Sequence, residues 1–418
     1  MKMIYLKVAF KNIFRNKRRT LLTLTAIGIT VFAFVAMLGW IEGIIDNWVD
    51  NTVRFSSGHV KLAHKKYLKK EKLLPIHFAV HNLSEVVDIV EEYKEVEMVT
   101  PRIRFGAQLE YEGRTADSVG IAVDPMKEKE ISRMPEFIKQ GSYWGKSDDE
   151  QDGIIIGNGM ASELGVEVGD EVSILSRTVN FSPYLLVYKV RGIYKSGIGT
   201  LDKNTFYITL KDAGDLLNLP DAANEVLIMI KDREKSYQLA SKIEKDLEEA
   251  GLKNDVVAVP WQEQKGMGHM LELTYNSMII ILLIVSIVAG LTILNTMLMS
   301  VFERSHEIGM MRALGMKKFS VLYLIIAEAL VIAFFACLIG GGIGAAVSYF
   351  WLEKYGVDFG SDMDVLSGWY FDPVMKSNFE FIQYIYGFVF GFILAGIAAI
   401  YPAFRAANMR PVEALRVI

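Results

Sequence analysis

The chain contains a single cysteine, Cys337, among its 418 residues. No disulfide can therefore form within it, and the long polar segment from Glu42 to Glu272 must fold by burial alone. A segment of that length is large enough to bury a hydrophobic core. The chain also lacks a basic patch interleaved with aromatic residues, so nothing in it indicates a nucleic-acid partner.

A nucleotide-binding motif is also missing. The segment Gln140–Ser147 ends like a phosphate-binding loop, but its first glycine is one residue too close to Gly145, and no apolar strand precedes it. Such a loop needs its full spacing because successive backbone N–H groups surround the phosphates. We therefore expect no ATPase and no cofactor in this chain. It offers no nucleophile constellation either, so we do not expect an enzyme.

The histidines do not indicate a metal site. His59, His64, His77 and His81 are close in sequence, but no HExxH motif and no cysteine accompanies them. A zinc site needs three or four such ligands, so we predict no bound metal.

Apolar residues, by contrast, are abundant: 51% of the chain is hydrophobic, and the mean hydropathy is +0.26. They gather in four long runs, of which only one contains a charge, Glu328. A helix needs about 20 apolar residues to cross a bilayer, and helices of soluble proteins are much shorter. We predict a membrane α-helical protein with four transmembrane helices, over residues 20–41, 273–302, 319–352 and 381–404.

The basic residues indicate the orientation. They cluster before the first run, between the second and third, and after the fourth, whereas residues 353–380 carry six acidic and two basic side chains. Basic residues mark the cytoplasmic side. We expect a multi-pass membrane protein with both termini in the cytoplasm. Residues 303–318 and 405–418 would be cytoplasmic, and residues 42–272 and 353–380 would lie outside.

The first 19 residues have an amphipathic pattern of their own. Lys7, Lys11 and Arg15 recur at helical spacing, and Phe10 and Phe14 fall on another face. Such a pattern is typical of a helix in the membrane surface, which we predict for residues 1–19. The alternative is a plain cytoplasmic start to the first spanning helix.

The outer segment, residues 42–272, is predicted to be a large mixed α/β domain. Alternating apolar residues predict a strand over Tyr184–Tyr194, and a short apolar run predicts another over Gly153–Gly157. The turn Asn180–Tyr184 is a predicted hairpin tip with two exposed aromatic rings. The alternative is an ordinary turn.

Two helices are predicted in the same domain. Ser84 is expected to cap one that runs toward Lys94. The other covers Glu234–Ala250 and stops at Gly251. One face of this second helix carries the apolar residues Ala240, Ile243 and Leu247.

The third apolar run contains the glycines Gly340, Gly341, Gly342 and Gly344. Their spacing favours close packing between helices and not nucleotide binding. Glu328 of the same run lies near its cytoplasmic end. It is either an interfacial charge or a charge in contact with another helix.

Several segments together resemble a known family. The loop Glu303–Gly315 (ERSHEIGMMRALG) resembles the RxxEIGxxRAxG signature of the FtsX/MacB superfamily of ABC permeases. The tail Tyr401–Arg416 is similar to that family's PAxxAAxxxPxEALR ending. Ala9–Gly28 resembles its N-terminal helix and first span, and Gly157–Leu175 resembles its GxxLAxxLGxxxGDxVxL stretch. The resemblance covers nearly the whole chain.

The resemblance implies a mechanism. Two permeases pair, as a homodimer or a heterodimer, and each docks a cytoplasmic ATPase that binds ATP and Mg²⁺. Closure of the ATPases then moves the helices, and the outer domains respond by mechanotransmission. The implied ATPase-coupling residues are Glu303, Arg304, Glu307, Ile308, Met311, Arg312 and Leu314. We expect the three apolar side chains to be exposed among the charges and to enter a groove of the ATPase; the alternative is a loop that merely joins two helices.

Within the superfamily, Arg191–Leu210 resembles the GxFxxGxxxxDxxxxYxxL stretch of the Lol lipoprotein-releasing permeases. This implies ATP-driven extraction of lipoproteins from the membrane. It also implies a hairpin that binds a periplasmic lipoprotein carrier, which would comprise Phe181, Ser182, Pro183 and Tyr184. The alternatives are MacB-like export of a peptide, drug or siderophore, and FtsX-like transmembrane signalling.

A lipidated cargo needs an apolar cleft that opens toward the bilayer. Methionine and aromatic side chains suit such a cleft because they adapt to acyl chains of varied shape. The predicted lining residues are Phe32, Phe34, Met37, Tyr275, Met278 and Leu282. The alternative is that these side chains face lipid or pack the helix bundle.

Overall fold

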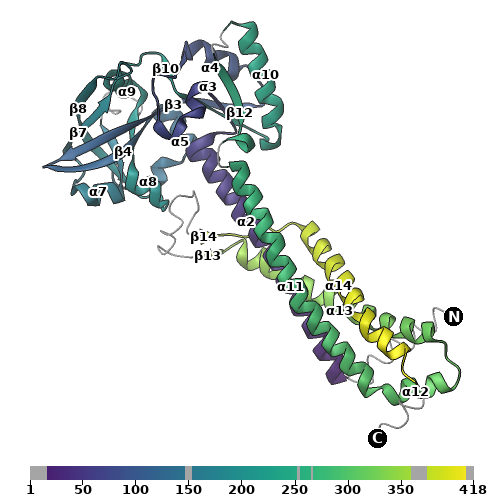
Figure 1. The fold of residues 1–418 in the computed structure, drawn as a ribbon. Helices are drawn as coiled ribbons and strands as arrows, with labels where there is room; N and C mark the ends of the chain where they lie inside the picture. The colour runs from purple at the N-terminus through teal and green to yellow at the C-terminus, as the bar shows by residue number, and fades with distance from the viewer. Residues whose placement is uncertain (1–16, 146–152, 252–254, 265–266, 359–373, 411–418) are drawn as a thin grey trace. The chain divides into compact units, whose positions relative to one another are not determined.

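A computed structural model describes residues 17–145, 153–251, 255–264, 267–358 and 374–410. The chain divides into two compact units (Figure 1). The helical unit contains the residues up to Asp46, Glu272–Asp358 and the residues from Val374 on, and the α/β unit contains Asn47–Leu271. The predicted surface helix lies outside the described residues up to position 16, as do residues 411–418 of the predicted tail.

Four long helices dominate the helical unit. They are α2 (Lys17–Thr52), α11 (Met267–Glu303), α13 (Lys318–Val347) and α14 (Phe381–Ala407). Each lies in a segment long and apolar enough to cross a membrane, so the prediction of four spanning helices and an α/β domain is confirmed. α2 continues well past the predicted end at Ile41, because the polar residues that follow include no helix-breaking proline.

Small residues allow α2 and α13 to pack closely. A Cβ added at Gly340 of α13 would collide with the backbone of Gly28 in α2. A Cβ at Gly344 would lie 2.8 Å from the carbonyl oxygen of Phe32. The predicted role of this glycine run in helix packing is confirmed, except at Gly342, where an added Cβ would meet open space.

α14 also packs through small residues. A Cβ at Gly387 or Gly391 would collide with the side chains of Val35 or Val31 of α2. Alanines of the same helix join the buried core of the unit: Ala395, Ala398, Ala399, Ala403, Ala406 and Ala407. In hydrocarbon, such close backbone approach and dispersion contacts replace the hydrophobic effect as the source of helix association.

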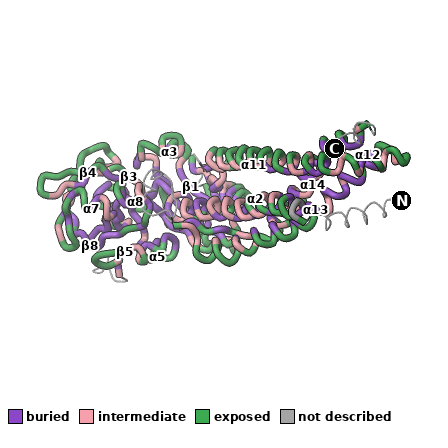
Figure 2. The backbone as a smooth tube through the Cα atoms, turned by 90° about the horizontal axis from the view of Figure 1, so that it is seen from below, coloured by how far each residue is buried: buried purple, intermediate pink, exposed green. Residues whose placement is uncertain are grey.

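α11 is the most exposed of the four helices, as its largely green tube in Figure 2 indicates. Apart from Met267 at its start, its buried apolar residues lie toward its C-terminal end, at Ala289, Ile293, Met297 and Val301. Its part from Leu273 to Leu291 presents apolar side chains that the single chain leaves uncovered: Leu273, Tyr275, Ile279, Ile280, Ile281, Leu283, Ile284, Ile287, Val288 and Leu291. A helix of this kind needs lipid or another membrane helix around it.

The segment that precedes α14 is bonded to α2. The π-helix η6 (Ser348–Leu352) follows α13, and β13 (Val357–Asp358) pairs with β14 (Val374–Met375). The backbone N–H of Asn378 donates to the carbonyl of Gly39 at 2.9 Å, and its side chain donates to Asp46 at 2.6 Å. The described part of the predicted outer loop is therefore held against α2.

The α/β unit is built on a mixed ten-stranded sheet with the order β12-β1-β11-β3-β4-β9-β6-β8-β5, in which β7 pairs with β3 and β8. The strands are β1 (Val60–His64), β3 (Val96–Tyr111), β4 (Arg114–Val123), β5 (Ile138–Gly141), β6 (Ile154–Gly157), β7 (Glu171–Arg177), β8 (Pro183–Tyr194), β9 (Thr205–Thr209), β11 (Glu225–Ile230) and β12 (Val256–Pro260). The two predicted strands correspond to β6 and β8.

Short helices cover the sheet. They are α3 (Lys65–Lys69), α4 (Leu83–Glu91), α5 (Pro125–Ile131), α6 (Met134–Phe137), α7 (Asn158–Leu164), α8 (Gly199–Asn204), α9 (Leu210–Leu217) and α10 (Ser236–Glu249). A two-stranded ladder, β2 (Val80–His81) with β10 (Ala222–Ala223), lies beside them. One apolar core packs α7 and α9 on β3, β4 and β6–β9, and a second packs α4 and α10 on β1, β11 and β12.

The predicted helix over Glu234–Ala250 corresponds to α10, whose Ala240, Ile243 and Leu247 are buried. The predicted cap at Ser84 is wrong. The chain enters α4 through Asn82, which has a φ of +52°, so Ser84 already lies in the first turn. Its hydroxyl donates instead to Asp221 at 3.1 Å.

Candidate functional site

The predicted coupling loop is a short helix at one end of the helical unit. α11 ends at Glu303, Arg304 precedes α12 (Ser305–Ala313), and α13 begins at Lys318 (Figure 1). A tight turn separates α12 from α13. Gly315 supplies the φ of +94° that this turn requires, and its N–H donates to the carbonyl of Arg312 at 3.1 Å.

An ion pair fixes the start of α12 to α13. Nη1 of Arg304 donates to Glu328 at 2.7 Å, and its Nε donates to Glu307 at 3.3 Å. Glu328 is buried and accepts from Arg304, so it is a charge in contact with another element. Burial disfavours the charged guanidinium, but Glu328 and Glu307 outweigh it and raise the pKa of Arg304 above its ordinary value.

The exposed apolar residues of this region are not all the predicted ones. Ile308 is only 4% exposed and packs in the core of the helical unit, so its predicted exposure is wrong. Met311 is half-buried against the same core. Leu314, in contrast, is 90% exposed, and Phe319 at the start of α13 is 84% exposed.

Met310 and Phe319 are exposed apolar residues of this region that were not predicted from the sequence. Met310 lies one turn before Leu314 and is 44% exposed. The spacing of the two residues was the available signal, because positions i and i+4 share a helix face. Among the charged residues, Glu303 is exposed, and Arg304, Glu307 and Arg312 are half-buried.

β7 and β8 form the predicted hairpin, but its turn ends earlier than predicted, because Pro183 and Tyr184 already pair with β7 as part of β8. Ile174 pairs with Leu186 and Arg177 with Pro183, and the N–H of Thr178 donates to the carbonyl of Ser182 at 2.9 Å. Phe181 is 64% exposed and Tyr184 is 45% exposed. Phe181 has a φ of +62°, a conformation that is rare for a bulky residue.

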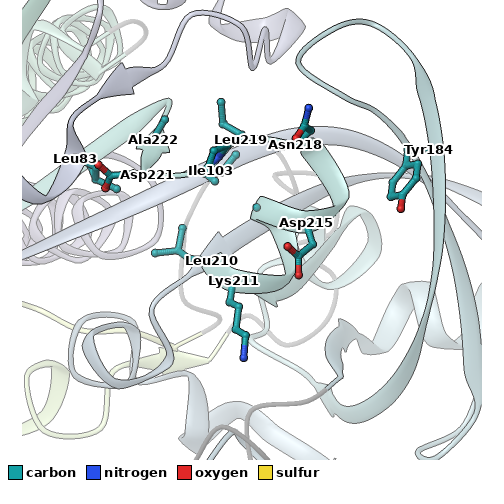
Figure 3. Close-up of a pocket in the computed structure, with 12 residues that line it drawn as sticks. Leu83, Ile103, Tyr184, Leu210, Lys211, Asp215, Asn218, Leu219, Asp221 and Ala222 are labelled. Carbon is teal, nitrogen blue, oxygen red and sulfur yellow. The ribbon is translucent and has the colours of Figure 1, made fainter.

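The tip is not free of the rest of the unit. The N–H of Val179 donates to the carbonyl of Leu217 at 2.9 Å. Tyr184 contributes to a pocket of about 680 Å³ whose other walls include Lys211, Asp215 and Asn218 (Figure 3). The ring of Phe181 lies 5.1 Å from that of His77 and borders a second groove.

The predicted cargo cleft is not supported at Phe34. This ring is 6% exposed and stacks on Phe390 of α14, with 4.2 Å between the ring centroids. Phe34 therefore packs the helix bundle, and its predicted place in an open cleft is wrong. Of the other five residues, Tyr275 is 50% exposed, and Phe32, Met37, Met278 and Leu282 are half-buried.

A buried ion pair ties the end of α2 to the sheet. α2 continues into the π-helix η1 (Val53–Ser57), and Arg102 of β3 donates to the carbonyl oxygens of Arg54 at 2.9 Å and Phe55 at 2.8 Å. The same guanidinium donates to Glu128 of α5 at 2.9 Å. Sequence reasoning missed this contact, because the three elements are distant in the chain.

The two stretches of the α/β unit that resemble the family, Gly157–Leu175 and Arg191–Leu210, contain residues with structural roles. Asp202 accepts from the N–H of Ser196 at 2.8 Å and from that of Gly197 at 3.1 Å, which closes the loop before α8. A Cβ at Gly157 would collide with the carbonyl of Asp202. Glycine at 157 and aspartate at 202 are therefore required by packing.

His59 is hydrogen-bonded to the backbone of β11. The Nδ1 of His59 accepts from the N–H of Ile230 at 3.1 Å, and burial together with Arg54 and Arg233 lowers the pKa of His59 to about 4. The described residues contain no group of three His, Cys, Asp or Glu side chains that could hold a metal ion.

Comparison with known proteins finds a matching domain for the α/β unit and another for the C-terminal helices. Residues 20–246 match the MacB-like periplasmic core domain, and residues 279–411 match the FtsX-like permease C-terminal domain. The chain belongs to the FtsX/MacB superfamily of ABC transporter permeases. Its members are permease subunits that work with an ATPase.

Relatives of this permease carry different names. It is 23% identical over 412 residues to an uncharacterized ABC transporter permease of Methanocaldococcus jannaschii, which covers 98% of this chain and 96% of that one. It is 25% identical over 307 residues to the lipoprotein-releasing system transmembrane protein LolC of Neisseria meningitidis, with 70% and 71% covered.

The permease is also 23% identical over 441 residues to the macrolide export ATP-binding/permease protein MacB of Bdellovibrio bacteriovorus, which covers 99% of this chain and 61% of that one. Among solved structures, the periplasmic region of MacB from Actinobacillus actinomycetemcomitans aligns with a TM-score of 0.37 and 10% identity, over 53% of this chain and 96% of that chain.

Proposed function

We propose that this permease is the membrane subunit of an ABC machine that extracts lipoproteins from the bacterial inner membrane by mechanotransmission. A separate cytoplasmic ATPase, which binds ATP and Mg²⁺, supplies the energy. The observation that carries the proposal is the pairing of an exposed coupling helix with a ring-bearing outer hairpin, in a chain similar to LolC over 70% of its length.

ATPase docking is assigned to α12 and the turn after it. Leu314, Phe319 and Met310 are exposed apolar side chains in a region that also exposes Glu303 and Lys318. Apolar anchors inside a charged rim are the usual composition of a helix that docks into a groove. The exposed positions support a contact through Leu314 and Phe319, with Ile308 as an internal support of α12.

Mechanical transmission is assigned to α2 and α11. Each helix contains residues of both units without a break, because the unit boundaries at Asp46 and Leu271 fall inside them. The hydrogen bonds from Arg102 then join the end of α2 to β3 and α5. A displacement of α2 along its axis would reach the sheet through this contact.

The outer partners are a second permease and a lipoprotein carrier. The uncovered part of α11 from Leu273 to Leu291 supports contact with a second permease, in a homodimer or a heterodimer. Carrier binding is assigned to Phe181, Ser182, Pro183 and Tyr184, where two exposed rings support it. Both termini would then be cytoplasmic, and the α/β unit would lie in the periplasm.

A second candidate function is export of a soluble peptide, drug or siderophore. The match of residues 20–246 to the MacB-like periplasmic core domain favours it, as does similarity to MacB over 99% of this chain. In that case the hairpin would contact an adaptor, and the helices would need no acyl-chain cleft. FtsX-like signalling to an outside enzyme is the third alternative.

Reconstitution in liposomes distinguishes lipoprotein extraction from export of a soluble substrate. The permease and its ATPase are placed in liposomes that contain a triacylated lipoprotein, and ATP-dependent transfer of the lipoprotein to soluble carrier is measured. Transfer with the wild type and none with Leu314→Asp is the expected result. ATP-dependent efflux of a macrolide or peptide, without transfer of any lipoprotein, would replace the leading proposal with the second.

A further inference from the structure

A groove runs beside the β7–β8 hairpin in the α/β unit, and we call it the hairpin groove. It has a volume of about 810 Å³. One wall is the segment Lys70–His77, the floor includes β3 around Gly106, and the other wall is the hairpin from Leu175 to Pro183. All three parts belong to the α/β unit.

Two apolar side chains project at this groove. Leu73 is 77% exposed and Phe181 is 64% exposed, which makes them the two most exposed large apolar residues among the described residues of the α/β unit. Both line the hairpin groove, one on each wall. Apolar side chains gathered around a concave surface in this way mark a binding site more than scattered ones do.

The rim of the groove is basic. Five exposed lysines fall in the eight residues Lys65–Lys72, and one of them, Lys70, lines the groove itself. Lys70 and Arg177 line the groove from opposite walls, and neither forms an ion pair with another described residue. Glu71 is occupied by the buried Lys61 at 3.0 Å, so it does not neutralise the rim. Asp117, which accepts from Gln108 at 3.1 Å, is the carboxylate of the lining.

We propose that the hairpin groove binds an acidic, amphipathic segment of a partner protein. The inference deepens the proposed role of the hairpin and rests on it, because it assigns the chemistry of the segment that the hairpin receives. Carboxylates of the segment pair with Lys70 and Arg177, and its apolar side chains fill the space between Leu73 and Phe181. An anionic membrane surface would satisfy the cations but would leave the interior of the groove empty.

Gly106 provides a test that spares the fold. A Cβ added there meets no atom within 4 Å, and its backbone does not have a positive φ. Because Gly106 lines the groove, a side chain added at this strand position starts in open space beside it. Because β-strands favour aromatic over glycine residues, Gly106→Tyr is expected to fold at least as well as the wild type.

The experiment uses the full chain in detergent and short fluorescent peptides in which Asp or Glu alternates with Leu or Phe. Fluorescence anisotropy is expected to show saturable binding that weakens as salt is added. Gly106→Tyr and the pair Lys70→Glu with Arg177→Glu are each expected to weaken binding about tenfold or more. The control variant Lys129→Glu, which changes an exposed lysine of α5 outside the groove lining, should bind like the wild type.

Three results would overturn the inference. They are equal affinity for peptides in which lysine replaces the acidic residues, unchanged affinity of Gly106→Tyr, and binding of phosphatidylglycerol vesicles in place of peptide. The lipoprotein-transfer assay separates this inference from the proposed function. If transfer persists in Gly106→Tyr and in the double charge variant, the proposed role of the hairpin groove is excluded, and lipoprotein extraction is still supported. If the peptide binds but no lipoprotein is transferred, the groove proposal is supported and lipoprotein extraction is excluded.

Discussion

At the scale of single residues, the pair Arg304–Glu328 decides how α12 is held. Both side chains are mostly removed from solvent, with side-chain exposures of 15% and 3%. Breaking such a pair leaves one charge buried without a partner, which costs about 3–5 kcal/mol in fully buried pairs and less where, as here, the arginine is partly exposed. The pair is therefore expected to keep α12 in one orientation against α13.

We predict that Glu328→Gln will weaken ATP-dependent coupling more than it weakens ATPase docking. The neutral side chain still accepts one hydrogen bond, but it no longer holds the charge of Arg304, so α12 moves less strictly with α13. The measurement compares co-purification of the ATPase with cargo transfer. Glu130→Gln, at an exposed carboxylate of α5 in the α/β unit, serves as control, and equal loss of docking and transfer in Glu328→Gln would contradict the prediction.

Leu314 and Ile308 should behave differently although both lie in the same signature. Leu314→Asp is expected to abolish co-purification of the ATPase and to leave the unfolding temperature unchanged, because the side chain is 90% exposed. Ile308→Ala, in contrast, opens the core and should lower the stability by about 2–5 kcal/mol. Normal docking by Leu314→Asp would contradict the assignment of the docking surface.

At the scale of elements, α2 is linked to the sheet through its π-helical end. Arg102 donates to the carbonyl oxygens of Arg54 and Phe55 in η1, and Glu128 balances its charge inside the fold. This arrangement puts a charge-assisted contact, and not only apolar packing, at the point where α2 ends.

We predict that Arg102→Met will destabilise the full chain by about 3–5 kcal/mol, because Glu128 loses its partner while fully buried. The double variant Arg102→Met with Glu128→Leu should recover much of that stability, since no buried charge remains. It should still transfer cargo poorly, because the carbonyl oxygens of η1 lose their donor. Thermal unfolding and transfer by the double variant test the two parts, and wild-type transfer would contradict the assigned role in transmission.

The sequence predicts the elements better than their contacts. The spans, β6, β8 and α10 follow from apolar periodicity and length, and the presence of the hairpin follows from the turn residues before β8. Ser84 and Ile308 were misjudged for a shared reason. A capping residue and an amphipathic loop are local patterns, but the φ of Asn82 and the core that receives Ile308 depend on tertiary structure. The contact of Arg102 with η1 has no local pattern at all.

At the scale of the whole molecule, orientation is the property on which the proposed function depends. The native Cys337 is buried, so it gives little background in a labelling experiment. Ser182→Cys at the hairpin tip is expected to react with a membrane-impermeant maleimide in intact spheroplasts. Leu314→Cys should react only after lysis. The reverse pattern would overturn the topology and, with it, the assignment of the ATPase to α12.

The contact between Gly28 and Gly340 also limits which motions the molecule can make. Where two backbones touch, one helix cannot slide or rotate past its neighbour without driving a Cβ into the opposing main chain. α2 and α13 therefore share their degrees of freedom and should move as one rigid pair, with α14 fitted to α2 through Val31 and Val35. α11 has fewer buried residues, so we expect it to change its tilt more readily than the other helices. A motion that begins at α12 would then displace the pair of α2 and α13 only slightly and would displace α11 more.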